Sequence, residues 1–261
     1  ERNFLGRGQT LNFDITLGLD NANTGITFVE PAFLGRDVSF AFTGEYRQTE
    51  YEYTSYDTQS LLFNPSLEFP VGQNSRFKLT YALSNNKIFN VDAASSTVLQ
   101  DEEAAGALVS SSIGYTYSRD TRRSGLDPDA GVLLRFGQEF GGLGGDVKFI
   151  KSTALVSAQA KVLNDGLTLR ATFEGGSLAM LDGGVSQLTD RFFLSSSKLR
   201  GFAPAGVGPR DTVAVNQDAL GGNNYAAARF EAEFPVGLPE EYGLSAGVFA
   251  DIGSVWGLDN D

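Results

Sequence analysis

Apolar and polar residues alternate along most of the chain, most clearly between Gln9 and Leu19, where leucine, phenylalanine or isoleucine fills every second position from Leu11 onward. Side chains alternate between the two faces of a β-strand, so this period predicts a strand with one apolar and one polar face. We therefore expect about eleven strands and almost no helix. Further segments with this period, separated by turn residues, lie at about 26–28, 38–42, 55–69, 77–83, 108–119, 132–140, 147–163, 167–173, 228–234 and 244–256.

The length of these segments and the charges within them favour a membrane barrel. Several reach about 10 residues, which suits a tilted transmembrane strand better than the roughly 5–6 residues typical of globular sheets. Charges in mid-strand fit either a water-facing sheet or a wet barrel lumen, but only the barrel also explains the length. We therefore predict an all-β fold, a transmembrane antiparallel β-barrel, with a large soluble β-sandwich or lectin-like domain as the alternative. The charged positions are Asp14, Lys78, Arg170, Glu174, Arg229 and Glu231.

One long segment, from about Asp182 to Gly222, has no strand period of its own. Loops of this length are rare in compact domains and are usually functional or disordered. This loop contains Arg200, Gly201 and Phe202 in a row, which combine a strong cation, a glycine and an aromatic side chain. We interpret it as a functional loop.

A second segment without a period, residues 89–104, is polar and acidic. We predict that it is an exposed loop. Its run Asp101-Glu102-Glu103 is interpreted as solvated charge, with cations that bridge lipopolysaccharide as the alternative.

Two other features could suggest ligands but are better explained as turns. Asp127-Pro128-Asp129 lacks the fuller spacing of a Ca²⁺-binding loop. The glycine-rich stretches at 6–8 and 141–145 open no predicted helix, as a phosphate-binding loop would require. Strand parity places Trp256 on the apolar face, where it would anchor the barrel at the membrane interface.

Composition narrows the possible functions. The chain has no Cys and no His, so it lacks a thiolate metal site, a Cys nucleophile and the commonest general base. No Ser, Lys or Tyr stands beside a credible base, and we predict no enzymatic activity, no metal and no cofactor. The net charge of −12 argues against nucleic acid as a partner. No apolar run approaches the length of a transmembrane helix, although a barrel hides its apolar band in every second residue.

Two stretches near the N-terminus match segments of a known family. The first, N-F-L-G-R-G at 3–8, resembles an N-x-L-G-x-G turn between early strands of the BamA family of outer-membrane insertases. The second, E-P-A-F-L-G-R at 30–36, is similar to the P-Y-F-x-G segment of that family, with Ala32 where tyrosine is usual. The positions that carry these turn motifs are Asn3, Leu5, Gly6, Gly8, Pro31, Phe33 and Gly35.

Three later stretches follow in the family's order. L-R-G-F at 199–202 resembles the V/I-R-G-F tetrad at the tip of the family's long sixth extracellular loop. L-G-G-N-N-Y at 220–225 is similar to the G-G-N that opens the next strand, and F-A-D-I-G-S-V-W at 249–256 to the F-x-D-x-G-x-V-W of the strand after it. With five matches in order over nearly the whole chain, the sequence resembles a BamA-type barrel.

The resemblance implies that residues 1–261 are part of a barrel with sixteen strands in the family. The POTRA repeats and the first and last strands would then be absent, in agreement with a chain that begins at Glu1 without a start Met. It further implies a central insertase that folds and inserts β-barrel proteins into the outer membrane of Gram-negative bacteria. The implied partners are unfolded outer-membrane protein clients, accessory lipoproteins of an assembly complex, and outer-membrane lipids with lipopolysaccharide.

Other barrels stay open as alternatives. A translocation barrel, either TamA-like or of the two-partner secretion type, would share the long loop and its arginine. A passive porin would share only the barrel. An outer-membrane phospholipase would need a catalytic His, which this chain lacks.

The resemblance also implies a role for the loop arginine. An arginine folded into the lumen needs carboxylate partners, because burying an unpaired charge is costly. Strand parity puts Glu231 and Asp251 on the polar face, with Phe249 positioned for a cation–π contact with Arg200. We expect these residues, with Gly201 and Phe202, to lock the loop to the lumen wall; an exposed arginine at a loop tip is the alternative. The serines at 195–197, where a Gly-Gly pair is frequent, leave the exact path of the loop open.

Overall fold

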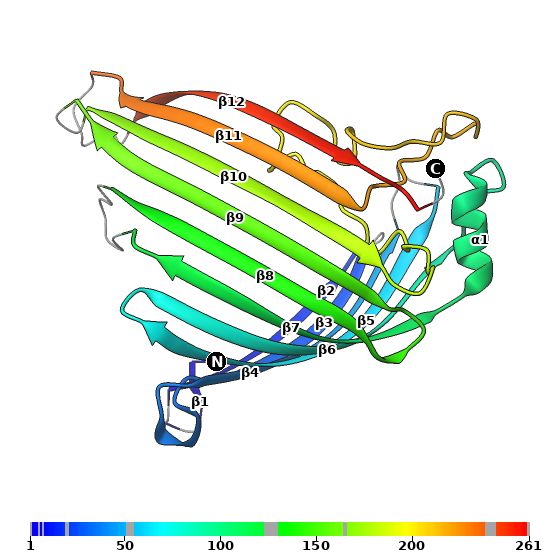
Figure 1. The fold of residues 1–261 in the computed structure, drawn as a ribbon, viewed down its shortest axis with the longest axis horizontal. Coiled ribbons are helices and arrows are strands. Elements are labelled where there is room, and N and C mark those ends of the chain that lie inside the picture. Colours follow the sequence, from blue (N-terminus) through cyan, green and yellow to red (C-terminus); the bar gives the residue numbers. More distant parts are fainter. Residues whose placement is uncertain are drawn as a thin grey trace.

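The computed structural model shows one antiparallel sheet in which strands that follow each other in the chain are neighbours, from β1 at one edge to β12 at the other (Figure 1). It describes residues 2–4, 6, 8–18, 21–50, 55–122, 130–163, 166–237 and 244–259. The strands are β1 (Arg2–Phe4), β2 (Gln9–Leu17), β3 (Asn21–Glu30), β4 (Ser39–Glu50), β5 (Asp57–Gly72), β6 (Ser75–Phe89), β7 (Leu108–Asp120), β8 (Ala130–Gly145), β9 (Phe149–Val162), β10 (Leu167–Met180), β11 (Asn224–Pro235) and β12 (Ser245–Trp256).

The sheet curves, so that β2 to β5 are seen behind β6 to β9 in Figure 1. Residues paired directly across neighbouring strands share a face, and the pairings form polar rows such as Asn12, Thr27, Thr43 and Asn64. The other face carries exposed large apolar side chains from one end of the sheet to the other, an arrangement that a lipid-facing wall requires. Examples from that apolar face are Phe13, Phe63, Ile113, Val156, Phe173, Phe230, Val248 and Ile252. The predicted all-β fold with alternating faces is confirmed.

The described residues form twelve strands, where the sequence predicts about eleven. The additional strand, β1, is only three residues long and falls within the N-terminal motif, which the sequence pattern presents as a turn. Of the rest of that motif, Gly6 at φ +72° and Gly8 at φ +76° lie in the turn between β1 and β2. Leu5 and the turn at 127–129 lie outside the described residues.

The predicted exposed loop at 89–104 is wrong, because its second half forms the helix α1 (Thr97–Ala105). Ser96 caps the helix by accepting a hydrogen bond from the Val98 amide at 3.3 Å. Leu99 is fully buried and Glu102 is 7% exposed, so the acidic run is not simply solvated charge. Tertiary contacts bury one side of the helix, and the composition of the segment alone does not indicate these contacts. Within the part of the chain that the structure describes, no helix is long and apolar enough to cross a membrane.

Buried apolar residues gather in three small clusters instead of one central core. They lie where α1 and the segment between β10 and β11 pack against the strands. The sheet therefore acts as a wall, and the loops supply the packing on its polar side.

Candidate functional site

The segment between β10 and β11, residues 181–223, is the long loop that the sequence predicts, and Figure 1 shows it beside the strand ends near α1. Two of its leucines, Leu194 and Leu199, are buried against Tyr225 of β11 and Val255 of β12. Strand β12 makes room for them with Gly253, where a Cβ would come within 3.0 Å of the Leu194 side chain. Tyr225 and Val255 belong to the polar face, so the loop folds back onto that face of the sheet.

This folding brings Arg200 to two carboxylates of the strand wall. Its Nε and Nη2 donate to the two oxygens of Asp251 at 2.7 and 2.6 Å, and its Nη1 donates to Glu231 Oε1 at 2.6 Å. The Arg200 backbone amide adds a hydrogen bond to Asp251 at 3.0 Å. The planar guanidinium thus donates two hydrogen bonds to the carboxylate of Asp251 and one to that of Glu231. Lysine cannot form the two parallel hydrogen bonds to one carboxylate, because its ammonium lacks the planar fork of donors.

Phe249 completes the arrangement, because the Arg200 guanidinium carbon lies 3.9 Å from the centre of its ring. Phe249 and Glu231 are directly paired across β11 and β12, which explains why both reach the same guanidinium. The Asp251 side chain is 3% exposed, whereas the Arg200 side chain keeps 30% of its surface. The anchor is therefore dry at Asp251 and still open to solvent at Arg200 and at Glu231, whose side chain is 36% exposed.

The other two residues of the predicted lock contribute differently. Gly201 adopts φ +86°, a conformation that favours glycine, so the chain can turn directly after the arginine. Phe202 is 51% exposed and lies outside the buried cluster of Leu194 and Leu199. The structure brings Arg200, Glu231, Phe249 and Asp251 together but leaves the Phe202 ring at the surface.

A neighbouring group of charges is not assigned by the sequence pattern. Glu174 of β10 receives Lys198 of the loop at 2.8 Å and Arg229 of β11 at 3.0 Å. Lys198 also lies over the ring of Tyr225, with its Nζ 4.6 Å from the ring centre. Strand parity places Glu174 on the polar face, so the sequence indicates where this carboxylate lies. The sequence does not indicate the path of the loop, which determines that Lys198 is the loop cation beside Glu174.

The turn motifs near the N-terminus lie at the ends of the strands opposite to the base of the long loop. Gly8 and Pro31 meet there, since a Cβ at Gly8 would lie 3.6 Å from Pro31 Cγ. Phe33 belongs to the short 3-10 element η1 (Phe33–Gly35), and its ring centre lies 5.3 Å from that of Phe40. These residues shape the turns on one side of the sheet and are not part of the loop site.

A curved antiparallel sheet with an apolar outer face, a polar inner face and a long loop folded onto the polar face has the architecture of an outer-membrane β-barrel wall. The chain belongs to the Omp85 superfamily, whose domain model matches residues 3–261.

Two relatives illustrate the range of the family. The outer membrane protein assembly factor BamA of Neorickettsia risticii is 31% identical over 204 residues, which cover 78% of this chain and 27% of that protein. The human sorting and assembly machinery component 50 homolog is 26% identical over 244 residues, covering 90% of this chain and 49% of that protein. The chain thus spans about half, or less, of these relatives' lengths.

Solved structures agree on the fold. BamA from Haemophilus ducreyi lacking POTRA domains 1–3 matches with a TM-score of 0.84 at 19% identity, over 98% of this chain and 54% of that one. CdiB from Acinetobacter baumannii matches with a TM-score of 0.58 at 14% identity, over 97% and 44% of the two chains. The family match and the structural match together identify the chain as part of a BamA-type barrel of the Omp85 superfamily.

Proposed function

We propose that the chain forms the barrel part of a bacterial insertase that folds and inserts β-barrel proteins into the outer membrane. The relatives named as an outer membrane assembly factor and as a sorting and assembly component support this class of function. The observation that carries the proposal is the anchoring of Arg200 to Asp251 and Glu231. It fixes a long loop on the wall facing the lumen.

The physical basis of such an activity is the cost of unpaired backbone in lipid. A strand that enters hydrocarbon without partners leaves each amide and carbonyl unsatisfied, at several kcal/mol per group. A barrel that offers a strand edge lets a client pair its backbone while it inserts. The role of the loop is mechanical: it holds the wall in one conformation while an edge elsewhere in the full barrel exchanges strands.

The proposed partners follow from this role. They are unfolded outer-membrane protein clients, accessory lipoproteins, and the lipids and lipopolysaccharide around the apolar face. The side with the long loop and α1 would be extracellular, because outer-membrane barrels carry their longer loops there. We propose no enzymatic step and no cofactor, in keeping with a sequence that has neither His nor Cys.

A charge-reversal cycle in the full-length protein tests the proposal. The variants are Arg200→Glu, Asp251→Arg and the two together. The readouts are the assembly of outer-membrane barrel proteins and the heat-modifiability of this barrel on gels. We expect each single change to impair both readouts and the double change to restore part of the loss, because the pair is re-formed with reversed polarity.

Arg210→Glu is the matched control. Arg210 is an exposed arginine of the same loop that donates to the backbone carbonyls of Ala205 and Gln217. Its substitution should leave assembly nearly unchanged. A silent Arg200→Glu would overturn the anchoring role, and intact barrel assembly with lost export of a secreted protein would favour a translocation barrel instead.

A further inference from the structure

A second arginine of the long loop, Arg191, is bonded in a different place from Arg200. Its side chain is 1% exposed, and its guanidinium contacts both ends of the loop. Nε donates to Ser186 Oγ at 2.9 Å, Nη1 donates to the Leu220 carbonyl at 3.1 Å, and Nη2 donates to the Ser186 carbonyl. One side chain therefore ties the start of the loop to its end.

The counter-charge of Arg191 comes from outside the loop. Glu102 of α1 lies 3.1 Å from Arg191 Nη2 and is itself buried. Its second oxygen accepts a hydrogen bond from the Leu188 amide of the loop at 2.8 Å. Burial raises the pKa of Glu102, while the bond from Leu188 and the charge of Arg191 act in the opposite direction. The carboxylate thus meets the loop at two points.

Other contacts align the helix with the same part of the loop. The Ser96 amide, at the start of α1, donates to Asp218 at 2.8 Å. Ile88 and Leu99 are buried together with Leu188 and Leu220, one residue from each end of the loop. The helix is therefore packed against both ends of the loop, and the ion pair between Arg191 and Glu102 lies within this packed region.

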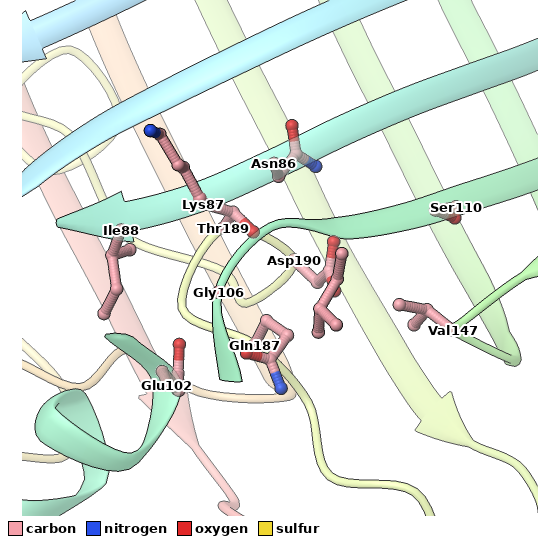
Figure 2. A pocket seen from close by; sticks show the side chains of 11 residues that line it. Asn86, Lys87, Ile88, Glu102, Gly106, Ser110, Val147, Gln187, Thr189 and Asp190 are labelled. Atoms are coloured by element: carbon pink, nitrogen blue, oxygen red, sulfur yellow. The ribbon is translucent and has the colours of Figure 1, made fainter. Parts of the chain in front are cut away.

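The space beside the pair is too small for a ligand. Figure 2 shows Glu102 of α1 and Gln187 and Asp190 of the loop around one cavity. Its volume is about 10 Å³, which is at the lower limit for a single water. The buried charges are thus an internal connection of the chain and not a pocket for a substrate.

A buried ion pair is an unfavourable way to gain stability alone, since apolar residues of equal size often serve better. Such a pair can instead favour one arrangement of helix and loop, because a charge separated from its partner in the interior is costly. The segment that leads to Arg200 begins directly after Arg191, where Phe192 and Gly222 exchange backbone hydrogen bonds at 2.8 and 3.1 Å. It then passes through the buried leucines Leu194 and Leu199.

We propose that Arg191 and Glu102 form a second anchor, which sets the register of the loop on α1 and so positions Arg200 at Asp251 and Glu231. Arg191 is a positioning residue in this scheme. The inference concerns the path of the loop, so its outcome is measured without an assembly assay and is separable from the proposed function.

The test is amide hydrogen exchange on the full-length protein in detergent or nanodiscs. The variants are Arg191→Glu, Glu102→Arg and the double swap. We expect each single variant to raise exchange at least tenfold in both the 186–191 segment and the 198–202 segment, where the Arg200 amide bonds Asp251. The swap should restore protection in part.

Two further variants keep the test decisive if the charge reversals fold poorly. Glu102→Gln keeps an acceptor for the Leu188 amide but removes the charge, and it should raise exchange at 198–202 by a smaller factor. Asp182→Asn removes the exposed ion pair of Asp182 with Lys148 at the start of the same loop and should change exchange less than twofold, because asparagine tolerates the positive φ of this position.

Faster exchange confined to α1 and residues 186–191, with 198–202 unchanged, would overturn the proposal and reduce the pair to local packing. The same conclusion would follow if Glu102→Gln, in a folded protein, left 198–202 as protected as in the original chain. Recovery by the swap together with loosened 198–202 in the single variants would support it.

Discussion

The two arginine anchors of the long loop use the same chemistry in opposite surroundings. Arg200 binds the strand wall and keeps 30% of its side chain in solvent, whereas Arg191 binds α1 and the loop base and is almost fully buried. An ion pair that stays wet is weakened by screening and can open in part. A dry pair is held completely or lost completely, because either charge alone is costly. The difference suggests that the loop has one adjustable contact and one fixed contact.

The largest effect is expected from Arg191→Ala. It leaves Glu102 buried without its cation, a change that costs about 3–5 kcal/mol in comparable pairs. On gels, the full-length barrel should change from its folded to its unfolded mobility at a clearly lower temperature. Lys148→Ala, which breaks the exposed pair at the start of the loop, is the control and should behave like the original protein. An equal effect of both changes would mean that burial does not distinguish the anchors.

A smaller effect is expected from Arg200→Lys. The positive charge stays, but the paired hydrogen bonds from the guanidinium to Asp251 are lost. We expect the loop to be destabilised by about 1.5 kcal/mol, the low end of the range for hydrogen bonds to charged groups, because the site is partly exposed to solvent. The opening free energy of the loop, measured by exchange of the Arg200 amide, should fall by that amount. Arg191→Lys should cost more. The reverse order would contradict the comparison.

Gly201→Ala probes the turn that follows the exposed anchor. Gly201 has φ +86°, and a Cβ there would meet no atom within 4 Å. The cost, about 1–2 kcal/mol, would therefore come from the backbone alone. Gly201→Asn should cost less, since asparagine tolerates this conformation better. The measurement is the thermal unfolding of the two variants. Equal losses of stability would mean that the added side chain, and not the backbone conformation, causes the effect.

The smallest effect is expected from Phe249→Leu. It removes the ring over which the Arg200 guanidinium lies and leaves both carboxylates in place, so a loss of about 0.5–1 kcal/mol follows from the cation–π contact. Exchange of the Arg200 amide is again the readout. Val248→Ala, on the apolar face one residue away, should not change it. A loss as large as that of Arg200→Lys would mean that the Phe249 ring, and not the paired hydrogen bonds to Asp251, contributes most of the stability of this contact.

The fold is largely predictable from the sequence because strand parity is a local property. Each of the longer strands alternates between its two faces residue by residue, and no β-bulge interrupts the pairing of β10, β11 and β12. Parity alone therefore identifies Glu231, Phe249 and Asp251 as members of one face, and the pairing of β11 with β12 brings them together. The strand β1 escapes detection because three residues carry no readable period.

The sequence by itself determined the barrel wall, its polar face and the carboxylates that pair with a cation there. Only the tertiary structure decided that residues 97–105 form a helix and that Glu102 meets Arg191. Helix α1 owes its stability to the burial of Leu99 and to contacts with a loop that follows four strands later. An acidic run has the same pattern in solvent and in a buried pair, because the distinction lies in a partner that only the folded chain brings near.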